Sequence, residues 1–141
     1  MNKQLKKVKQ FHKKFGLEAL KKKPGIPENN DVVIRRHRLI REEFLELQAE
    51  MMPTYDSDLG KIAKEMADLL YVIYGAVLEY GLEDKMEKIF DMVHKSNMSK
   101  LDKDGKVLKD EGGKVLKGPN YSPANIGKVI KINKNEQKEI I

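Results

Sequence analysis

Four segments within the first hundred residues repeat apolar positions with the period of an α-helix. They cover residues 3–22, 32–52, 59–80 and 83–98. Capping residues support these bounds, because Asn30 or Asp31 can cap the second segment and Asp58 can cap the third. Gly81 can end the third segment. Breaker-rich stretches, "KPGIPENND" and "TYDSDLGK", separate the first three segments. The pattern predicts an all-α protein of four to five helices.

The periodicity changes after residue 100. The motif GKVLK occurs twice, at 105–109 and 113–117, and the two copies flank "DEGG". Short alternating runs around such a turn predict a β-hairpin. We therefore expect a helical bundle with a C-terminal β-hairpin arm in one domain over 1–132. Its helical core would cover 1–100, the hairpin and arm 101–132, and a frayed tail 133–141.

Composition is typical of a single soluble domain. The chain has 141 residues, is 40% hydrophobic, and contains no cysteine, which excludes disulfides and thiolate metal sites. The N-terminal stretch lacks the apolar core of a signal peptide. Its longest nearly apolar run, "LLYVIYGAVL", is ten residues long, too short to span a bilayer. We expect a cytoplasmic protein without a membrane segment.

Charge is distributed unevenly along the chain. Residues 1–27 hold nine lysines and one acid, residues 28–94 hold eight basic and fifteen acidic residues, and residues 95–141 hold eleven lysines and six acids. Solvated lysines explain the ends of the chain as well as any binding role does. The acidic middle, by contrast, suits a cation site attended by groups that bind an anion. This distribution argues against a nucleic-acid partner, because a nucleic-acid binder usually carries its basic charge as one stripe.

The stretch "REEFLEL", residues 41–47, crowds three glutamates into five positions. Glu43 and Glu46 are three residues apart, and Glu42 and Glu46 are four apart, so all three share about one helix face, where like charges repel. A second pair, Glu65 and Asp68, lies in the third helical segment. Asp68 falls at the edge of a mostly apolar helix, where a bare carboxylate would cost several kcal/mol.

Antiparallel packing of these two helices would bring ExxE against ExxD. Four carboxylates without cysteine or histidine favour a hard divalent ion, Mg²⁺ or Mn²⁺. A metal would offset the repulsion among the glutamates, and Glu42 could then be a further ligand or position a water. Arg38 and Arg41 lie about one turn before the cluster. They are either salt-bridge partners or ligands for an anionic substrate.

Several stretches together resemble a known family. "REEFLEL", "KEMADLLYVIYGAVLEYG", "VHKSNMSK" and "GKVLKGPNYSP" are similar to the all-α nucleoside triphosphate pyrophosphohydrolases, which include MazG, dimeric dUTPases and phosphoribosyl-ATP pyrophosphohydrolases. The likeness covers about residues 8–127 and is strongest to the small phosphoribosyl-ATP pyrophosphohydrolase-like branch. The superfamily signature is ExxE, a spacer and ExxD; here eighteen residues separate Glu46 from Glu65.

The resemblance implies roles for particular residues. Glu43, Glu46, Glu65 and Asp68 would bind Mg²⁺, and Glu42 or Glu43 would help activate the attacking water. Residues that would contact the substrate are Arg38, Asn97, Lys100, Lys117 and Tyr121. On the residues alone, Asn97 is equally an ordinary helix C-cap and the arm lysines are ordinary exposed charges.

The resemblance also implies a reaction and an assembly. Family members hydrolyse a nucleoside triphosphate between its α and β phosphates, releasing a nucleoside monophosphate and diphosphate. A pyrimidine deoxynucleotide such as dUTP or dCTP is the favoured substrate, although no specificity motif in the sequence selects the base. Homodimers or larger homo-oligomers are expected, since the helices have more apolar surface than four short helices can cover.

Two other interpretations compete with this one. Asp91 and His94 form a DxxH pair that would suit a di-iron carboxylate bundle, but such bundles use two ExxH motifs. A non-enzymatic basic helical module could instead bind nucleic acid through its lysines, with strong salt dependence. The nucleic-acid module does not explain an acid beside the apolar surface of the third helix.

Overall fold

The computed structural model describes residues 3–17, 21–52 and 58–130, and the described chain is helical. Within these ranges no β-strand occurs, which confirms the all-α class. The chain divides into two compact units after Asp84. The helices are α1 (Lys3–Lys14), α2 (Asn30–Glu50), α3 (Leu59–Glu79), α4 (Met86–Met98) and α5 (Gly127–Ile130). A single domain over 1–132 therefore stays a prediction.

Helix α1 ends earlier than the periodicity predicts. The expected helix over 3–22 stops at Lys14, because Gly16 adopts a left-handed conformation with φ 65°. The amide of Leu17 then donates to the carbonyl of His12 at 2.9 Å, the bond that closes a glycine-terminated helix. The predicted helix was wrong at residues 15–17 and 21–22 because the apolar pattern continues past a stop signal, and residues 18–20 lie outside the described residues.

The ends of α2 and α3 follow the predicted chemistry closely. Asn29, one residue before the expected caps, accepts from the amide of Asp31 at 2.9 Å. Asp58 caps α3 as predicted, accepting from the amide of Gly60 at 2.7 Å. Gly81 closes α3 with φ 65°, and a Cβ there would overlap the carbonyl of Lys23. These caps fix where the acidic segments lie along each helix.

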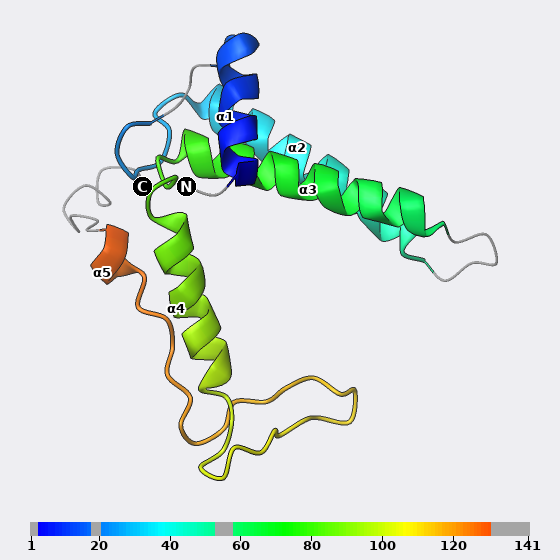
Figure 1. Cartoon of the computed structure of the whole chain (residues 1–141), viewed down its shortest axis with the longest axis vertical. Coiled ribbons are helices and arrows are strands. Elements are labelled where there is room, and N and C mark those ends of the chain that lie inside the picture. Colours follow the sequence, from blue (N-terminus) through cyan, green and yellow to red (C-terminus); the bar gives the residue numbers. More distant parts are fainter. Residues whose placement is uncertain (1–2, 18–20, 53–57, 131–141) are drawn as a thin grey trace. The chain divides into compact units, whose positions relative to one another are not determined.

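Helices α2 and α3 run side by side in opposite directions, and α1 packs across α3 (Figure 1). The buried apolar side chains of this first unit come from all three helices. They are Leu5 and Val8 of α1, Val32 of α2, and Val72, Val77 and Leu78 of α3. Burying each such side chain contributes about 1.5–3 kcal/mol. This small core holds the α2–α3 pair in register.

A buried ion pair lies between the start of α2 and the end of α3. Arg36 is 5% exposed and Glu79 is fully buried, and the guanidinium donates to both carboxylate oxygens. Arg36 Nη1 also donates to the carbonyl of Val72 at 3.1 Å. The guanidinium lies against Gly75, where a Cβ would overlap it. Arg35 adds a longer bond to Glu79, at 3.1 Å.

The second unit contains α4, an irregular arm and α5. In the arm, one isolated antiparallel bridge joins Lys109 and Val115, and no strand is present among the described residues 101–130. The predicted β-hairpin is therefore not confirmed. The arm contacts the end of α4, because the Gly118 amide donates to the Lys100 carbonyl at 3.0 Å.

Among the residues that the structure describes, none of the helices combines the length and the apolar character needed to cross a membrane.

Candidate metal centre

Three glutamates converge where α2 faces α3. Glu43 and Glu46 come from α2 and Glu65 comes from α3, and one carboxylate oxygen of each lies within 4.8 Å of the others. The antiparallel arrangement explains this approach, because the middle of α2 then faces the first half of α3. The predicted contact between ExxE and ExxD thus includes three of the four acids. We call these three residues the carboxylate cluster.

Glu65 is the most deeply placed member of the carboxylate cluster. The residue is 8% exposed, and its Oε1 accepts from Lys64 Nζ at 2.9 Å. Its Oε2 is buried and has no hydrogen-bond partner among the described residues. A buried carboxylate oxygen without a partner costs about 1–3 kcal/mol or more, so it calls for a cation or a donor. An all-oxygen donor set with such an oxygen fits a hard divalent ion.

The electrostatics of Glu43 reflect this crowding. Burial raises the pKa of the Glu43 carboxyl, and the negative charges of Glu46, Asp68 and Glu65 raise it further. The positive charge of Lys64 acts in the opposite direction and is the weakest of these influences. Several carboxylates that disfavour one another's ionisation would be stabilised by a cation placed among them.

Asp68 is more exposed than the apolar character of α3 suggests. Its side chain is 41% exposed, and its Oδ2 contacts Lys64 Nζ at 2.9 Å. We expected this acid to be either paired or metal-bound, and it is paired with a lysine one turn earlier. Asp68 is not one of the three converging acids, although its charge acts on Glu43. Its role as a metal ligand stays a prediction.

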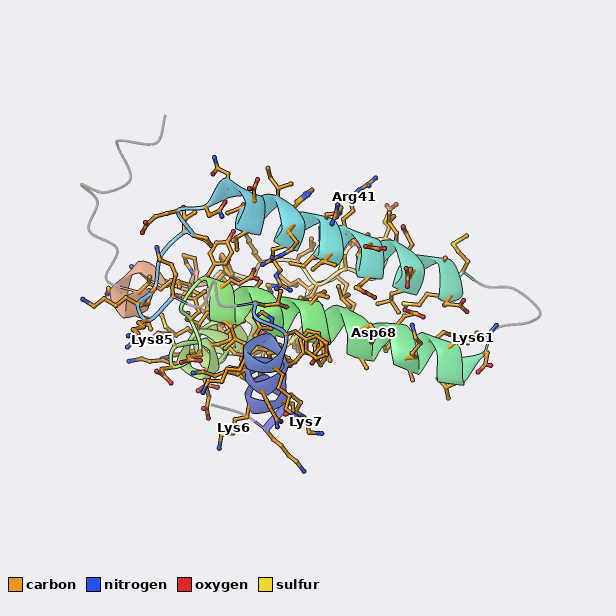
Figure 2. The ribbon with its side chains drawn as sticks, turned by 90° about the horizontal axis from the view of Figure 1, so that it is seen from above. Lys6, Lys7, Arg41, Lys61, Asp68 and Lys85 are labelled. Carbon is orange, nitrogen blue, oxygen red and sulfur yellow. The ribbon has the colours of Figure 1, made fainter. Side chains whose placement is uncertain are left out.

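Other predicted residues of α2 are exposed. Glu42 and Arg38 lie on the solvent side of their turns, and Figure 2 shows Arg41 on the side of α2 turned away from α3. The structure thus gives Arg41 no contact with the carboxylate cluster. Glu42 and Arg38 remain candidates for water activation and for anion binding.

The remaining predicted substrate residues belong to the second unit. Asn97 and Lys100 lie at and just after the end of α4, and Lys117 and Tyr121 lie on the arm. The Lys117 ammonium stands over the Tyr121 ring, 4.6 Å from its centroid. Ser99 joins the two segments, because its hydroxyl accepts from the Ser122 amide at 2.9 Å. The arm and the end of α4 thus carry these four residues together, and their role at a substrate stays a prediction.

Two important side chains were missed by the sequence reasoning. Glu79 is the most buried carboxylate that the structure describes, and Arg36 is its partner. Burial alone raises the Glu79 pKa, but the hydrogen bonds and charges of Arg36 and Arg35 outweigh it, so that pKa is lowered. The available signal was the placement of Glu79 in the apolar run "YVIYGAVLEYG", the same reasoning that drew attention to Asp68.

A separate hollow lies between α1 and α3. Its volume is about 240 Å³, and its lining is mainly apolar and aromatic, including Val8, Leu70, Tyr71 and Tyr74, with Lys7 and Gln4 from α1. This lining suits an apolar group rather than a metal ion. The carboxylate cluster is thus the better candidate for chemistry on a charged substrate.

Residues 8–97 match the family model described as phosphoribosyl-ATP pyrophosphohydrolase. The chain belongs to this family. The matched region contains the whole of α2 and α3, and therefore the carboxylate cluster, Asp68 and Arg38. Lys100, Lys117 and Tyr121 lie beyond it. No curated protein matches the sequence.

Family membership places the chain among the MazG-like nucleoside triphosphate pyrophosphohydrolases, and so among hydrolases. Enzymes of this type generally depend on a divalent cation, and this chain has a carboxylate cluster. Membership also favours hydrolysis over the di-iron bundle and the nucleic-acid module considered from the sequence.

Proposed function

We propose that this phosphoribosyl-ATP pyrophosphohydrolase family member is a Mg²⁺-dependent nucleoside triphosphate pyrophosphohydrolase. The reaction is (d)NTP + H₂O to (d)NMP + diphosphate, with cleavage of the α–β phosphoanhydride bond. A pyrimidine deoxynucleotide such as dUTP or dCTP is the favoured substrate. The observation that carries the proposal is the approach of Glu43, Glu46 and Glu65 within 4.8 Å, with a buried, unpartnered oxygen on Glu65.

The metal ligands in this proposal are Glu43, Glu46, Glu65 and Asp68, and Mn²⁺ is an alternative to Mg²⁺. When bound, the ion would lower the pKa of a water and neutralise charge developing on phosphoryl oxygens. Glu65 anchors the set because it is buried in the α2–α3 pair, whereas the 41% exposed Asp68 can adjust its position.

Water activation belongs to Glu42 or Glu43. Both are adjacent on α2, but they differ in surroundings, since Glu42 is exposed and Glu43 is half-buried beside the other acids. A general base must lie within hydrogen-bond reach of the water whose proton it accepts. Glu43 is part of the carboxylate cluster itself, and Glu42 is its neighbour toward solvent.

Substrate binding would use cationic and polar groups outside the carboxylate cluster. Arg38 precedes Glu42 by one helical turn and is exposed, so its guanidinium is free to meet an anionic group. Asn97, Lys100, Lys117 and Tyr121 supply further donors and one aromatic ring. The contact of Lys117 with Tyr121 pre-orients both side chains on the arm.

We also expect self-association and a cytoplasmic location. Large apolar side chains remain exposed on the two helices that carry the cluster, among them Phe44 at 51%, Leu70 at 53% and Met66 at 44%. Burying such groups between copies would stabilise a homodimer or larger homo-oligomer. Size-exclusion chromatography with light scattering measures the assembly directly.

The deciding experiment is product analysis with purified protein. A panel of ribonucleoside and deoxyribonucleoside triphosphates, dUTP included, is incubated with Mg²⁺, and nucleotides and diphosphate are quantified separately. We expect monophosphate and diphosphate in equal amounts, abolished by EDTA, Glu46→Gln and Glu65→Gln. Glu50→Gln is the matched control, because Glu50 lies one turn after Glu46 on α2 but outside the carboxylate cluster.

Other products would contradict the proposal in distinct ways. Release of orthophosphate with a diphosphate nucleotide would mean cleavage at the β–γ bond. Full activity of both cluster variants would remove the carboxylate cluster from the reaction. Equal turnover of purine and pyrimidine nucleotides would remove only the base preference.

A further inference from the structure

Lys64 contacts the acids of the candidate metal centre from their own helix. Its Nζ lies 2.9 Å from Glu65 Oε1 and 2.9 Å from Asp68 Oδ2. The first partner is the next residue in the sequence, and the second is four residues later, the spacing that places two side chains side by side on a helix. One ammonium thus bridges two of the four proposed metal ligands.

The side chains of Lys64 and Glu65 differ in burial. The Lys64 side chain is 63% exposed, whereas that of Glu65 is 10% exposed. Hydrogen bonds to Asp68 and then to Glu65 raise the Lys64 pKa, so the side chain carries its positive charge throughout the neutral range. Lysine is a compact, strongly hydrated charge on a flexible stem, and from this position it can turn into solvent.

The contacts divide the carboxylate oxygens into two groups. Lys64 occupies Glu65 Oε1 and Asp68 Oδ2, while Glu65 Oε2 is buried without a partner among the described residues. The ammonium therefore offsets negative charge at Glu65 Oε1 and Asp68 Oδ2. It makes no hydrogen bond to the buried Glu65 Oε2. If Asp68 turned both of its oxygens toward a metal ion, its bond to Lys64 would break.

We propose that Lys64 is an exchangeable counter-ion of the metal centre. It offsets part of the negative charge of Glu65 and Asp68, and a divalent cation displaces it from Asp68. The inference rests on the proposed metal-dependent function and assigns Lys64 a positioning role. Lys64 therefore stabilises the metal-free protein and lowers its affinity for metal.

Elementary electrostatics gives both effects. A single positive charge beside two carboxylates stabilises them, and the same charge repels a dication at the same acids. If the ammonium and the ion are separated by about 6 Å of water, this repulsion weakens metal binding by about tenfold without salt and by about threefold at physiological salt. The energy needed to release Asp68 lowers the apparent affinity further, because only the released form binds.

The test compares Lys64→Gln with Lys61→Gln. Lys61 is an exposed lysine of the same helix, toward its start, so both variants lose one charge from α3 (Figure 2). Mn²⁺ binding is measured by electron paramagnetic resonance of the free ion, with Mg²⁺ as competitor, and melting temperature is measured in EDTA and in saturating Mg²⁺. We expect Lys64→Gln to bind Mn²⁺ about three- to tenfold more tightly and to melt lower than wild type only in EDTA. Lys61→Gln should change affinity by less than about twofold.

The outcomes separate this inference from the proposed function. If wild type binds Mn²⁺ and Glu46→Gln abolishes binding, the metal centre stands. Unchanged or weaker binding by Lys64→Gln would then overturn the counter-ion role alone, as would an equal loss of melting temperature in EDTA and Mg²⁺. If wild-type protein binds neither ion, the metal centre and the role of Lys64 both fall.

Discussion

Arg36 holds Glu79 through both oxygens of its carboxylate, with donor–acceptor distances of 2.8 and 2.7 Å. The pair joins the first turns of α2 to the last turn of α3. Glu43 follows Arg36 by seven residues on α2, about two helical turns. The ion pair therefore fixes the register in which the two acidic segments meet, without itself contacting the carboxylate cluster.

Removing one partner of this buried pair should be costly. Glu79→Gln leaves the Arg36 charge without its counter-ion, and we expect the free energy of unfolding to fall by about 3–5 kcal/mol. Urea denaturation measures the change. The control is Glu83→Gln, which breaks the half-buried pair of Lys9 and Glu83 at 2.8 Å and should cost about 1 kcal/mol or less. Similar losses from both variants would contradict a special role for Glu79.

Gly75 should reverse the usual effect of alanine in a helix. Gly→Ala inside a helix ordinarily adds about 1 kcal/mol of stability. At Gly75 the new Cβ would overlap the Arg36 guanidinium, so we expect a net loss of about 1–3 kcal/mol. Denaturation of Gly75→Ala tests this, with Gly112→Ala as a control whose Cβ would meet its nearest neighbour at 3.5 Å. A stabilised Gly75→Ala protein would show that the guanidinium can move aside.

His12 should make the first unit sensitive to mild acid. The His12 pKa is lowered below 6.5, chiefly by burial and then by the positive charge of Arg36. The charge of Glu79 raises this pKa, and that of Arg35 lowers it. The unfolded state therefore binds a proton more readily than the folded state does. The contribution of neutral His12 to the free energy of unfolding is fully present above pH 6.5 and declines as the pH falls below it. The slope cannot exceed about 1.4 kcal/mol per pH unit for one group.

Unfolding free energies between pH 7 and 5 test this prediction. We expect His12→Gln to flatten the profile, whereas His94→Gln, at an exposed position of α4, should leave it unchanged. An identical slope in wild type and His12→Gln would assign the acid sensitivity to other groups.

The repulsion within the carboxylate cluster predicts opposite effects of one substitution. Glu43→Gln removes a charge that lies beside Glu46, Asp68 and Glu65, so we expect it to stabilise the protein in EDTA by about 0.3–1 kcal/mol. We expect Mg²⁺ to raise the melting temperature of wild type, and the same variant should lose this rise. Differential scanning calorimetry with and without Mg²⁺ measures both, with Glu50→Gln as control. Destabilisation in EDTA would mean that Glu43 serves a structural contact.

Local chemistry was the part of the fold that the sequence predicted well. Asp58 and Gly81 begin and end α3 as expected, because capping depends on one residue and its immediate neighbours. Gly16 was overlooked because the apolar period continued past it. The approach of Glu43 and Glu46 to Glu65 followed from spacing and antiparallel packing. The Arg36–Glu79 pair did not, since it joins residues 43 positions apart and neither motif nor period marks it.

The two places where α2 and α3 are tied together differ in kind. At one end, Arg36 and Glu79 form an ion pair that is shielded from solvent. About two turns away, the contacts of the carboxylate cluster and Lys64 would, under the proposals above, depend on which cations the solution contains. The concentration of divalent ions would therefore set the stiffness of only the acidic half of the helix pair. Adding a divalent ion would slow amide hydrogen exchange in that half, while exchange in the half that contains Arg36 and Glu79 would keep its rate.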